Sequence, residues 1–215
     1  TAADCDQDGQ PDSCAEPLPF DDHSVEFEDL NDRARMDSFS GFPSNELTVS
    51  MWVKTEDVTR SSGLFSYAVP GSDDELMLYN QNNLTMFMNT TQVFQSGVSI
   101  ADGQWHHVAA TWLTDGAVSF ANLYVDGVNV ASNVFFEGDN SGFDDGGTVM
   151  LGEAQDCVGG CLATDHALIG HVDELRLWNV ERTAEEIQAD MNTQLEGFHP
   201  NLVGYWQFNE GQGDV

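Results

Sequence analysis

Basic residues are almost absent from this chain of 215 residues. Lys and Arg together number 6 against 37 Asp and Glu, so the formal net charge is −31, and Lys54 is the only lysine. Nucleic-acid backbones and anionic membrane surfaces are both recognised by clustered Lys and Arg. The composition therefore argues against both classes of partner. Such an acidic excess repels itself in the folded state, and salt or bound divalent cations would relieve that repulsion.

Long apolar runs are also lacking, because none reaches the roughly 18 residues that a membrane-spanning helix requires. We expect no membrane insertion. Apolar residues still make up 40% of the chain and aromatic residues 10%, which is enough for a buried core. The chain begins at Thr1 without Met and stops inside the ordered-looking stretch GYWQFNEGQGDV. We therefore expect a piece of a longer protein, with other domains of the same chain beside it.

Two regions differ in composition. Residues 1–19 (TAADCDQDGQPDSCAEPLP) are rich in Asp, have almost no core-forming residues, and end at Pro17 and Pro19. This segment predicts an acidic loop and a semi-rigid linker. The globular domain is expected over residues 20–215.

The domain shows the period of two that is typical of strands. In the stretch 47–54, Leu and Val positions alternate with Thr, Ser, Trp and Lys. Asp126-Gly127 predicts a two-residue hairpin turn, and Thr183 with Glu186 forms a capping box that opens one helix. We predict an all-β, two-sheet antiparallel jelly-roll sandwich with one short helix in its C-terminal region. The expected strands are 47–54, 64–68, 75–79, 84–88, 104–113, 121–125, 128–131, 149–152, 169–178 and 202–208.

The N-terminal acidic loop has the spacing of a calcium loop. Its Asp residues follow D-x-D-x-D-G-x-x-D, with the Gln10 carbonyl at the seventh position. An EF-hand is disfavoured because Ala15 stands where a bidentate Glu is expected. The segment resembles the calcium loops of thrombospondin type 3 repeats, whereas a solvated linker is the plainer alternative. The predicted ligands are Asp4, Asp6, Asp8, Gln10 and Asp12.

The four cysteines fall in two close pairs, Cys5 with Cys14 and Cys157 with Cys161. Four cysteines allow three pairings, and we favour the local one because each pair brackets its own short loop. A zinc site is the rival interpretation, but the Cys5/Cys14 spacing is wrong for it. Disulfides predict a secreted or cell-surface protein.

Five segments of the domain carry a family resemblance: SYAVPGSDDE, DGQWHHVAATW, LYVDGV, LGEAQDCVGG and GHVDELRLWN. They resemble segments of the pentraxin and laminin-G-like jelly rolls of the concanavalin A-like lectin/glucanase group. The first and the fourth are similar to the two pentraxin segments that hold calcium. The resemblance implies Ca²⁺ ligands at Asp73, Asp74, Asp156 and, through its backbone carbonyl, Gln155.

Three departures from the pentraxin pattern weaken this expectation. The family's bridging Glu aligns with Ala154, and the later Glu and Gln align with Ala163 and His166. A second domain calcium is therefore not expected. Glu153 and Asp165 each lie one residue out of register and are possible substitutes.

An enzyme is not expected. Retaining glycosidases need two carboxylates about 5–5.5 Å apart, and glucanases of this group place them on one strand as E-x-D-x-E. Here Asp173 and Glu174 are adjacent, so regular alternation would point them to opposite faces of a strand. We expect a non-catalytic, calcium-binding recognition module of a larger extracellular protein, adhesive or lectin-like, that binds a glycan or another polar ligand. A calcium-rigidified spacer domain is the alternative, and a glucanase is a weaker third.

Overall fold

The computed structural model describes residues 23–136, 141–160 and 165–210. Its strands are β1 (Val25–Phe27), β2 (Ala34–Met36), β3 (Glu46–Lys54), β4 (Gly63–Val69), β5 (Ser72–Tyr79), β6 (Thr85–Met88), β7 (Thr91–Gln95), β8 (Trp105–Thr114), β9 (Ser119–Val125), β10 (Val128–Phe136), β11 (Thr148–Leu151), β12 (Gly170–Trp178) and β13 (Leu202–Trp206), and its helix is α1 (Ala184–Asp190). No helix in this part of the chain is long and apolar enough to cross a membrane.

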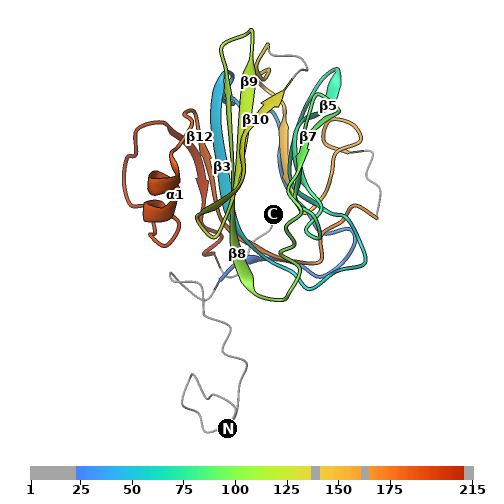
Figure 1. The fold of residues 1–215 in the computed structure, drawn as a ribbon. Coiled ribbons are helices and arrows are strands. Elements are labelled where there is room, and N and C mark those ends of the chain that lie inside the picture. Colours follow the sequence, from blue (N-terminus) through green and yellow to red (C-terminus); the bar gives the residue numbers. More distant parts are fainter. Residues whose placement is uncertain (1–22, 137–140, 161–164, 211–215) are drawn as a thin grey trace, which may run out of the picture.

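The strands form two antiparallel sheets that face each other (Figure 1). The first has the order β1-β12-β3-β8-β9-β10, with β13 also pairing with β12, and the second has the order β2-β11-β4-β5-β6-β7. The predicted two-sheet jelly roll with one helix is therefore confirmed. The sequence did not predict β1, β2 or β7, and β10 runs five residues further than expected.

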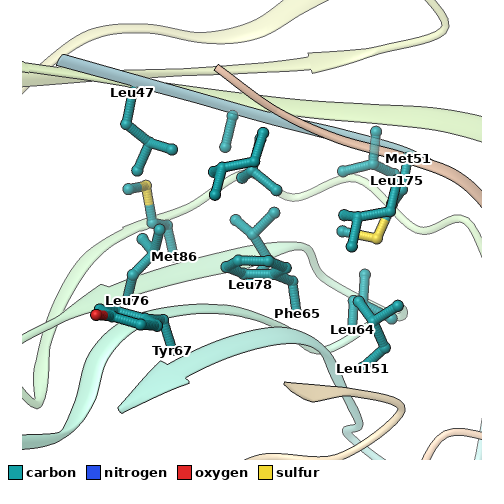
Figure 2. Close-up of a cluster of buried hydrophobic side chains, with 14 of the residues drawn as sticks. Leu47, Met51, Leu64, Phe65, Tyr67, Leu76, Leu78, Met86, Leu151 and Leu175 are labelled. Atoms are coloured by element: carbon teal, nitrogen blue, oxygen red, sulfur yellow. The ribbon is translucent and has the colours of Figure 1, made fainter. Parts of the chain in front are cut away.

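The core lies between the two sheets and is filled from both (Figure 2). Leu47, Met51 and Leu175 come from the first sheet, and Phe65 and Leu78 come from the second; none of these side chains is more than 1% exposed. The alternation in β3 has its expected effect, because the apolar positions face the core. The intervening Thr48 and Ser50 are nevertheless buried as well.

Thr48 and Ser50 are buried because helix α1 covers the outer face of the first sheet beside β12 and β3 (Figure 1). The capping box is confirmed: the Thr183 hydroxyl accepts from the Glu186 backbone, and the Glu186 carboxylate accepts from the Thr183 backbone. Trp52 of β3 donates its indole N–H to the Met191 carbonyl, at 2.9 Å. The helix and the turn after it are thereby fixed on the sheet.

A buried cation adds a second attachment beneath this helix. Arg176 is 2% exposed and pairs with the Glu174 carboxylate at 2.5 Å. The same guanidinium donates to the carbonyls of Asp190 and Thr193, both at 2.7 Å. Arg176 therefore joins one oxygen of a buried carboxylate to the C-terminal end of α1, while the other oxygen, Glu174 Oε1, has no hydrogen-bond partner among the described residues.

Strand β10 forms an edge of the first sheet. Its pairing with β9 shifts register twice, between Asn129 and Ala131 and between Ala131 and Val134. Asn133, between the second pair, has a positive φ of 47°. The edge strand is therefore irregular along its length.

Arg176→Met should destabilise the domain by about 3–5 kcal/mol, because it leaves the Glu174 carboxylate buried without its partner. Chemical denaturation would measure this change in the free energy of unfolding. The control Arg182→Met removes a more exposed ion pair with Asp190 and should cost about 1 kcal/mol or less. The double variant Arg176→Met/Glu174→Gln should recover part of the loss. If Arg176→Met and Arg182→Met lower the free energy of unfolding by the same amount, this account is contradicted.

Candidate functional site

The chain that leaves β11 packs directly on the start of β4. A Cβ atom on Gly63 would lie 2.3 Å from the Ala154 nitrogen and 2.4 Å from the Glu153 carbonyl carbon. Three residues further along β4, the Ser66 hydroxyl donates to the Glu153 carbonyl oxygen at 3.0 Å. Only glycine permits this approach, so Gly63 fixes where residues 153 and 154 cross the sheet.

Gln155 then organises the loop that follows. Its side chain is fully buried and donates to the Ser66 hydroxyl (3.1 Å) and the Thr148 carbonyl (3.0 Å). Its amide oxygen accepts from the Gly159 backbone at 2.8 Å, and Arg35 holds the Gly159 carbonyl at 2.8 Å. The amide nitrogen and the amide oxygen of Gln155 thus both have partners within the protein, and the backbone carbonyl is the ligand atom that the family resemblance implies.

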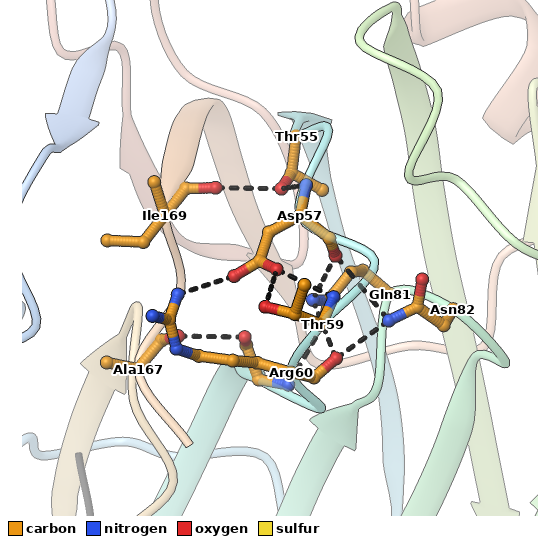
Figure 3. Close-up of polar contacts among 9 residues, drawn as sticks. Thr55, Asp57, Thr59, Arg60, Gln81, Asn82, Ala167 and Ile169 are labelled. Carbon is orange, nitrogen blue, oxygen red and sulfur yellow. Dashed lines mark hydrogen bonds and ion pairs between the residues drawn. The ribbon is translucent and has the colours of Figure 1, made fainter. Parts of the chain in front are cut away.

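A second segment, residues 165–169, is tied to the loop between β3 and β4. The Gly63 backbone donates to the His166 carbonyl (2.9 Å), and the Ser62 hydroxyl donates to the Ala167 carbonyl (2.8 Å). Thr55 donates to the Ile169 carbonyl at 2.7 Å (Figure 3). These contacts place Asp165 and His166 beside the crossing at Gly63.

The loop between β3 and β4 is itself held by a buried amide (Figure 3). Gln81 donates to the carbonyls of Asp57 (2.9 Å) and Arg60 (3.1 Å) and accepts from the Ser62 backbone at 2.9 Å. Asp57 also pairs with the Arg60 guanidinium at 2.6 Å. Each buried polar group of this turn has a partner, so the support for residues 165–169 is rigid.

Three carboxylates gather where these segments meet. Glu153 is 1% exposed, and its Oε1 has no hydrogen-bond partner in the described part of the chain. Burial raises the pKa of Glu153 from 4.5 to about 7; Asp156 and Asp165 add to the rise, while the Ala154 N–H and Arg33 oppose it. Asp156 and Asp165 are exposed. The result is a buried acid behind two solvated ones.

Aromatic rings border the three acids. Burial raises the pKa of Tyr79, and the charges of Asp165, Asp156 and Glu153 add to the rise, while a hydrogen bond with Ser61 opposes it. The Tyr79 ring meets Phe87 edge-on at 6.1 Å and His166 edge-on at 5.5 Å between centroids. The His166 Nδ1 is buried and has no partner among the described residues. We name Glu153, Asp156, Asp165, Tyr79 and His166 the acidic–aromatic site.

The predicted ligands are distributed unevenly around this site. Asp156 belongs to it, and the Gln155 carbonyl is next to it. Asp73 is half-buried near the start of β5, and Asp74 follows it in the same strand. Within the described residues, no three His, Cys, Asp or Glu side chains converge closely enough to hold a metal ion. The proposed calcium set therefore stays a prediction.

Other predicted site residues fall outside the described part of the chain. They are Asp4, Asp6, Asp8, Gln10, Asp12, Cys5, Cys14 and Cys161. Cys157 is disulfide-bonded. Its pairing with Cys161 remains a prediction.

The expectation that Asp173 and Glu174 point to opposite faces of β12 is wrong. The strand bulges between Asp173 and Arg176, and Glu174 has a positive φ of 51°. Asp173 pairs in register with Trp52 and Arg176 with Ser50, while Glu174 bonds Arg176 and, at 2.5 Å, the Tyr205 hydroxyl. All three side chains therefore share the outer face. Both acids are at most 2% exposed, so they form a framework pair that substrate cannot reach.

Comparison with known proteins places these features in a family. The family model of the concanavalin A-like lectin/glucanases superfamily (Laminin_G_3) matches residues 27–188. Human neuronal pentraxin-2 is 29% identical over 158 residues, covering 70% of this chain and 35% of that protein, so the chain spans about a third of that relative's length. C-reactive protein 1.4 of Limulus polyphemus is 31% identical over 148 residues, covering 66% of this chain and 60% of that protein.

A solved structure agrees with the fold. The heptameric SAP-like pentraxin of Limulus polyphemus matches with a TM-score of 0.62 at 22% identity, covering 76% of this chain and 78% of that one. At this identity the match supports the fold alone.

Gly63→Ala should destabilise the domain by at least about 2 kcal/mol, because the new methyl group meets backbone atoms that cannot turn away. Thermal and chemical denaturation would measure the loss. Gly160→Ala is the matched control, since its Cβ would meet only the Cys157 sulfur at 3.9 Å. Equal stability of Gly63→Ala and wild type would show that residues 153 and 154 do not rest on Gly63.

Glu153 should make the metal-free domain less stable as pH rises. Its folded pKa of about 7 lies above the 4.5 of the unfolded chain, so the stability difference is absent below pH 4.5 and grows as pH rises to about 7. Glu153→Gln should therefore melt with wild type near pH 4 but at a higher temperature near pH 8, both in chelator. If the difference in melting temperature between the two proteins is the same at every pH in this range, the Glu153 carboxylate is not buried and charged in the folded domain.

Proposed function

Because the chain belongs to the concanavalin A-like lectin/glucanase superfamily, and its domain is a pentraxin- and laminin-G-like jelly roll, we propose that it is a calcium-dependent recognition module. A lectin-type domain of this kind is a ligand-binding module. The finer proposal is that the ligand is a glycan or another polar molecule, bound at the acidic–aromatic site.

One observation carries the calcium proposal: the buried Glu153 oxygen that has no partner. A buried, unpaired carboxylate is costly, and a cation beside it would remove that cost. The neighbouring donors are carboxylate and carbonyl oxygens, which suit Ca²⁺. Asp156 and Asp165 are exposed, so they can adjust to an ion without repacking the core.

The proposed ligand set keeps the residues that the family resemblance implied. It consists of Asp73, Asp74, the Gln155 carbonyl and Asp156. Asp73 and Asp74 lie near the start of β5, whereas Tyr79 ends that strand, so the candidate ligands at the acidic–aromatic site itself are the Gln155 carbonyl, Asp156, Glu153 and Asp165. Bound calcium would supply a positive charge and open coordination positions for ligand hydroxyl or carboxylate oxygens. Tyr79, Phe87 and His166 would give the same ligand an apolar contact.

The proposal also covers the N-terminal segment, the lack of catalysis and the location of the protein. The N-terminal loop is proposed as a second, independent calcium site at Asp4, Asp6, Asp8, Gln10 and Asp12. A non-catalytic role is supported by the buried, Arg-paired state of Glu174, the nearest candidate for a glycosidase acid. A secreted or cell-surface location is supported by the disulfide-bonded Cys157 and by the extracellular character of pentraxin relatives.

Calcium should raise the melting temperature of the intact chain. At 100 times its dissociation constant, a single-site ligand stabilises a fold by about 2.7 kcal/mol. Glu153→Gln should lose the part of this shift that belongs to the domain, and Asp8→Asn should lose the part that belongs to the N-terminal loop. Glu196→Gln, at an exposed acid outside both sites, is the control. Identical melting curves in calcium and in EDTA would refute the calcium proposal.

Ligand recognition needs its own measurement. A glycan array probed with and without EDTA should show binding that chelation reduces at least about tenfold. Loss of the same signals in Glu153→Gln, but not in Glu196→Gln, would place the ligand at the acidic–aromatic site. A calcium shift without any glycan binding would instead favour the spacer domain.

A further inference from the structure

A polar cavity lies at the end of the second sheet, at the opposite end of β5 from Tyr79. Its volume is about 410 Å³, within the range of small-molecule sites. Three segments that are remote in sequence line it: the turn between β4 and β5, the turn between β6 and β7, and residues 141–144. The acidic–aromatic site shares none of these lining residues.

The walls of the cavity are held in place by hydrogen bonds. The Ser72 hydroxyl bonds the Asn89 side-chain oxygen at 3.1 Å, which joins the two turns. Glu75 is 4% exposed, and its Oε1 accepts from the Asp144 backbone at 2.9 Å. The Tyr67 hydroxyl donates to the Asp144 carbonyl at 2.8 Å and accepts from the Gly147 backbone at 2.9 Å. The cavity is therefore preformed, as a binding site should be.

Two of its residues have an uncommon backbone conformation. Asn89 and Thr90 have φ values of 45° and 62°, in the left-handed region. Asn tolerates that region, but it is a genuine outlier for a β-branched residue such as Thr. Glycine would relieve the strain at both positions. Strained residues cluster at binding sites, and here they lie in the wall of the cavity.

The lining chemistry points to a neutral ligand rich in hydroxyl groups. Ser72 and Thr90 bring hydroxyls, Asn89 an amide, and Glu75 and Asp144 carboxylates. The carboxylates and the net charge of −31 disfavour an anion. Sugar hydroxyls both donate and accept, so they match such a mixed lining.

We propose that this cavity is a calcium-independent binding site for a neutral sugar residue. The proposal does not depend on the acidic–aromatic site, and the two can fail separately. The cavity lacks an aromatic wall among its described lining residues, so its hydrogen bonds must compete with water, and affinity in the millimolar range is expected.

The test uses the intact chain in EDTA. Saturation-transfer NMR would be recorded with glucose, galactose, mannose, N-acetylglucosamine and arabinotriose, each titrated to about 20 mM. At least one should bind saturably. The double variant Asn89→Gly/Thr90→Gly keeps the turn conformation and removes both side chains, so it should weaken that sugar at least about tenfold without lowering the melting temperature.

Asn133→Gly is the matched control, because Asn133 has a φ of 47° and lies outside the cavity. Its sugar binding should equal that of wild type. Ser72→Ala leaves the backbone conformation unchanged and should also weaken binding, which keeps the test decisive if the double variant does not fold. The proposal is overturned if no sugar binds in EDTA, if binding appears only with calcium, or if both cavity variants bind as wild type does.

Discussion

The contact between Gly63 and the backbone of Glu153 and Ala154 determines what the rest of the site can be. Because no side chain fits there, residues 153 and 154 lie flat on β4, and the Glu153 side chain is buried. The same crossing brings Asp156 to the surface and lets the Gly63 backbone hold the His166 carbonyl. Because Gly63 has no Cβ atom, residues 153–156 and residues 165–166 can both approach the start of β4.

Four of the six basic residues hold parts of the fold together. Arg35 holds the Gly159 carbonyl, Arg60 pairs with Asp57, and Arg176 joins Glu174 to the end of α1. Arg182 stacks on Trp178, with 4.0 Å between the guanidinium carbon and the ring centroid, and pairs with Asp190. These four cations therefore neutralise or support specific groups rather than the acidic surface as a whole. The excess negative charge of the protein is therefore screened by solvent and salt or neutralised by bound ions.

Much of the fold could be predicted from sequence because several of its strands are long and carry apolar residues at the positions that face the core. Alternation was sufficient to predict β3, and the capping box at Thr183 was sufficient to predict the helix. The three-residue strands β1 and β2 carry too few positions for a period to be visible, and β10 continues past Ala131 only through irregular pairing. The sequence does not single out Glu153, because its burial depends on Gly63, 90 positions earlier, and no local pattern reveals that contact. The bulge that places Asp173 and Glu174 on one face likewise depends on pairing with β3.

The irregular edge strand β10 bears on how this protein behaves at high concentration. Its sequence, VNVASNVFF, contains no charged residue, and an unpaired edge of that kind is a template for strand addition between molecules. Charged side chains on the edge strand are the usual protection against such strand addition, and β10 has none. Here the two register shifts and the left-handed Asn133 interrupt the row of free backbone groups instead. Protection against aggregation at this edge therefore comes from backbone shape, so it should persist in concentrated salt, where the repulsion between acidic molecules is screened.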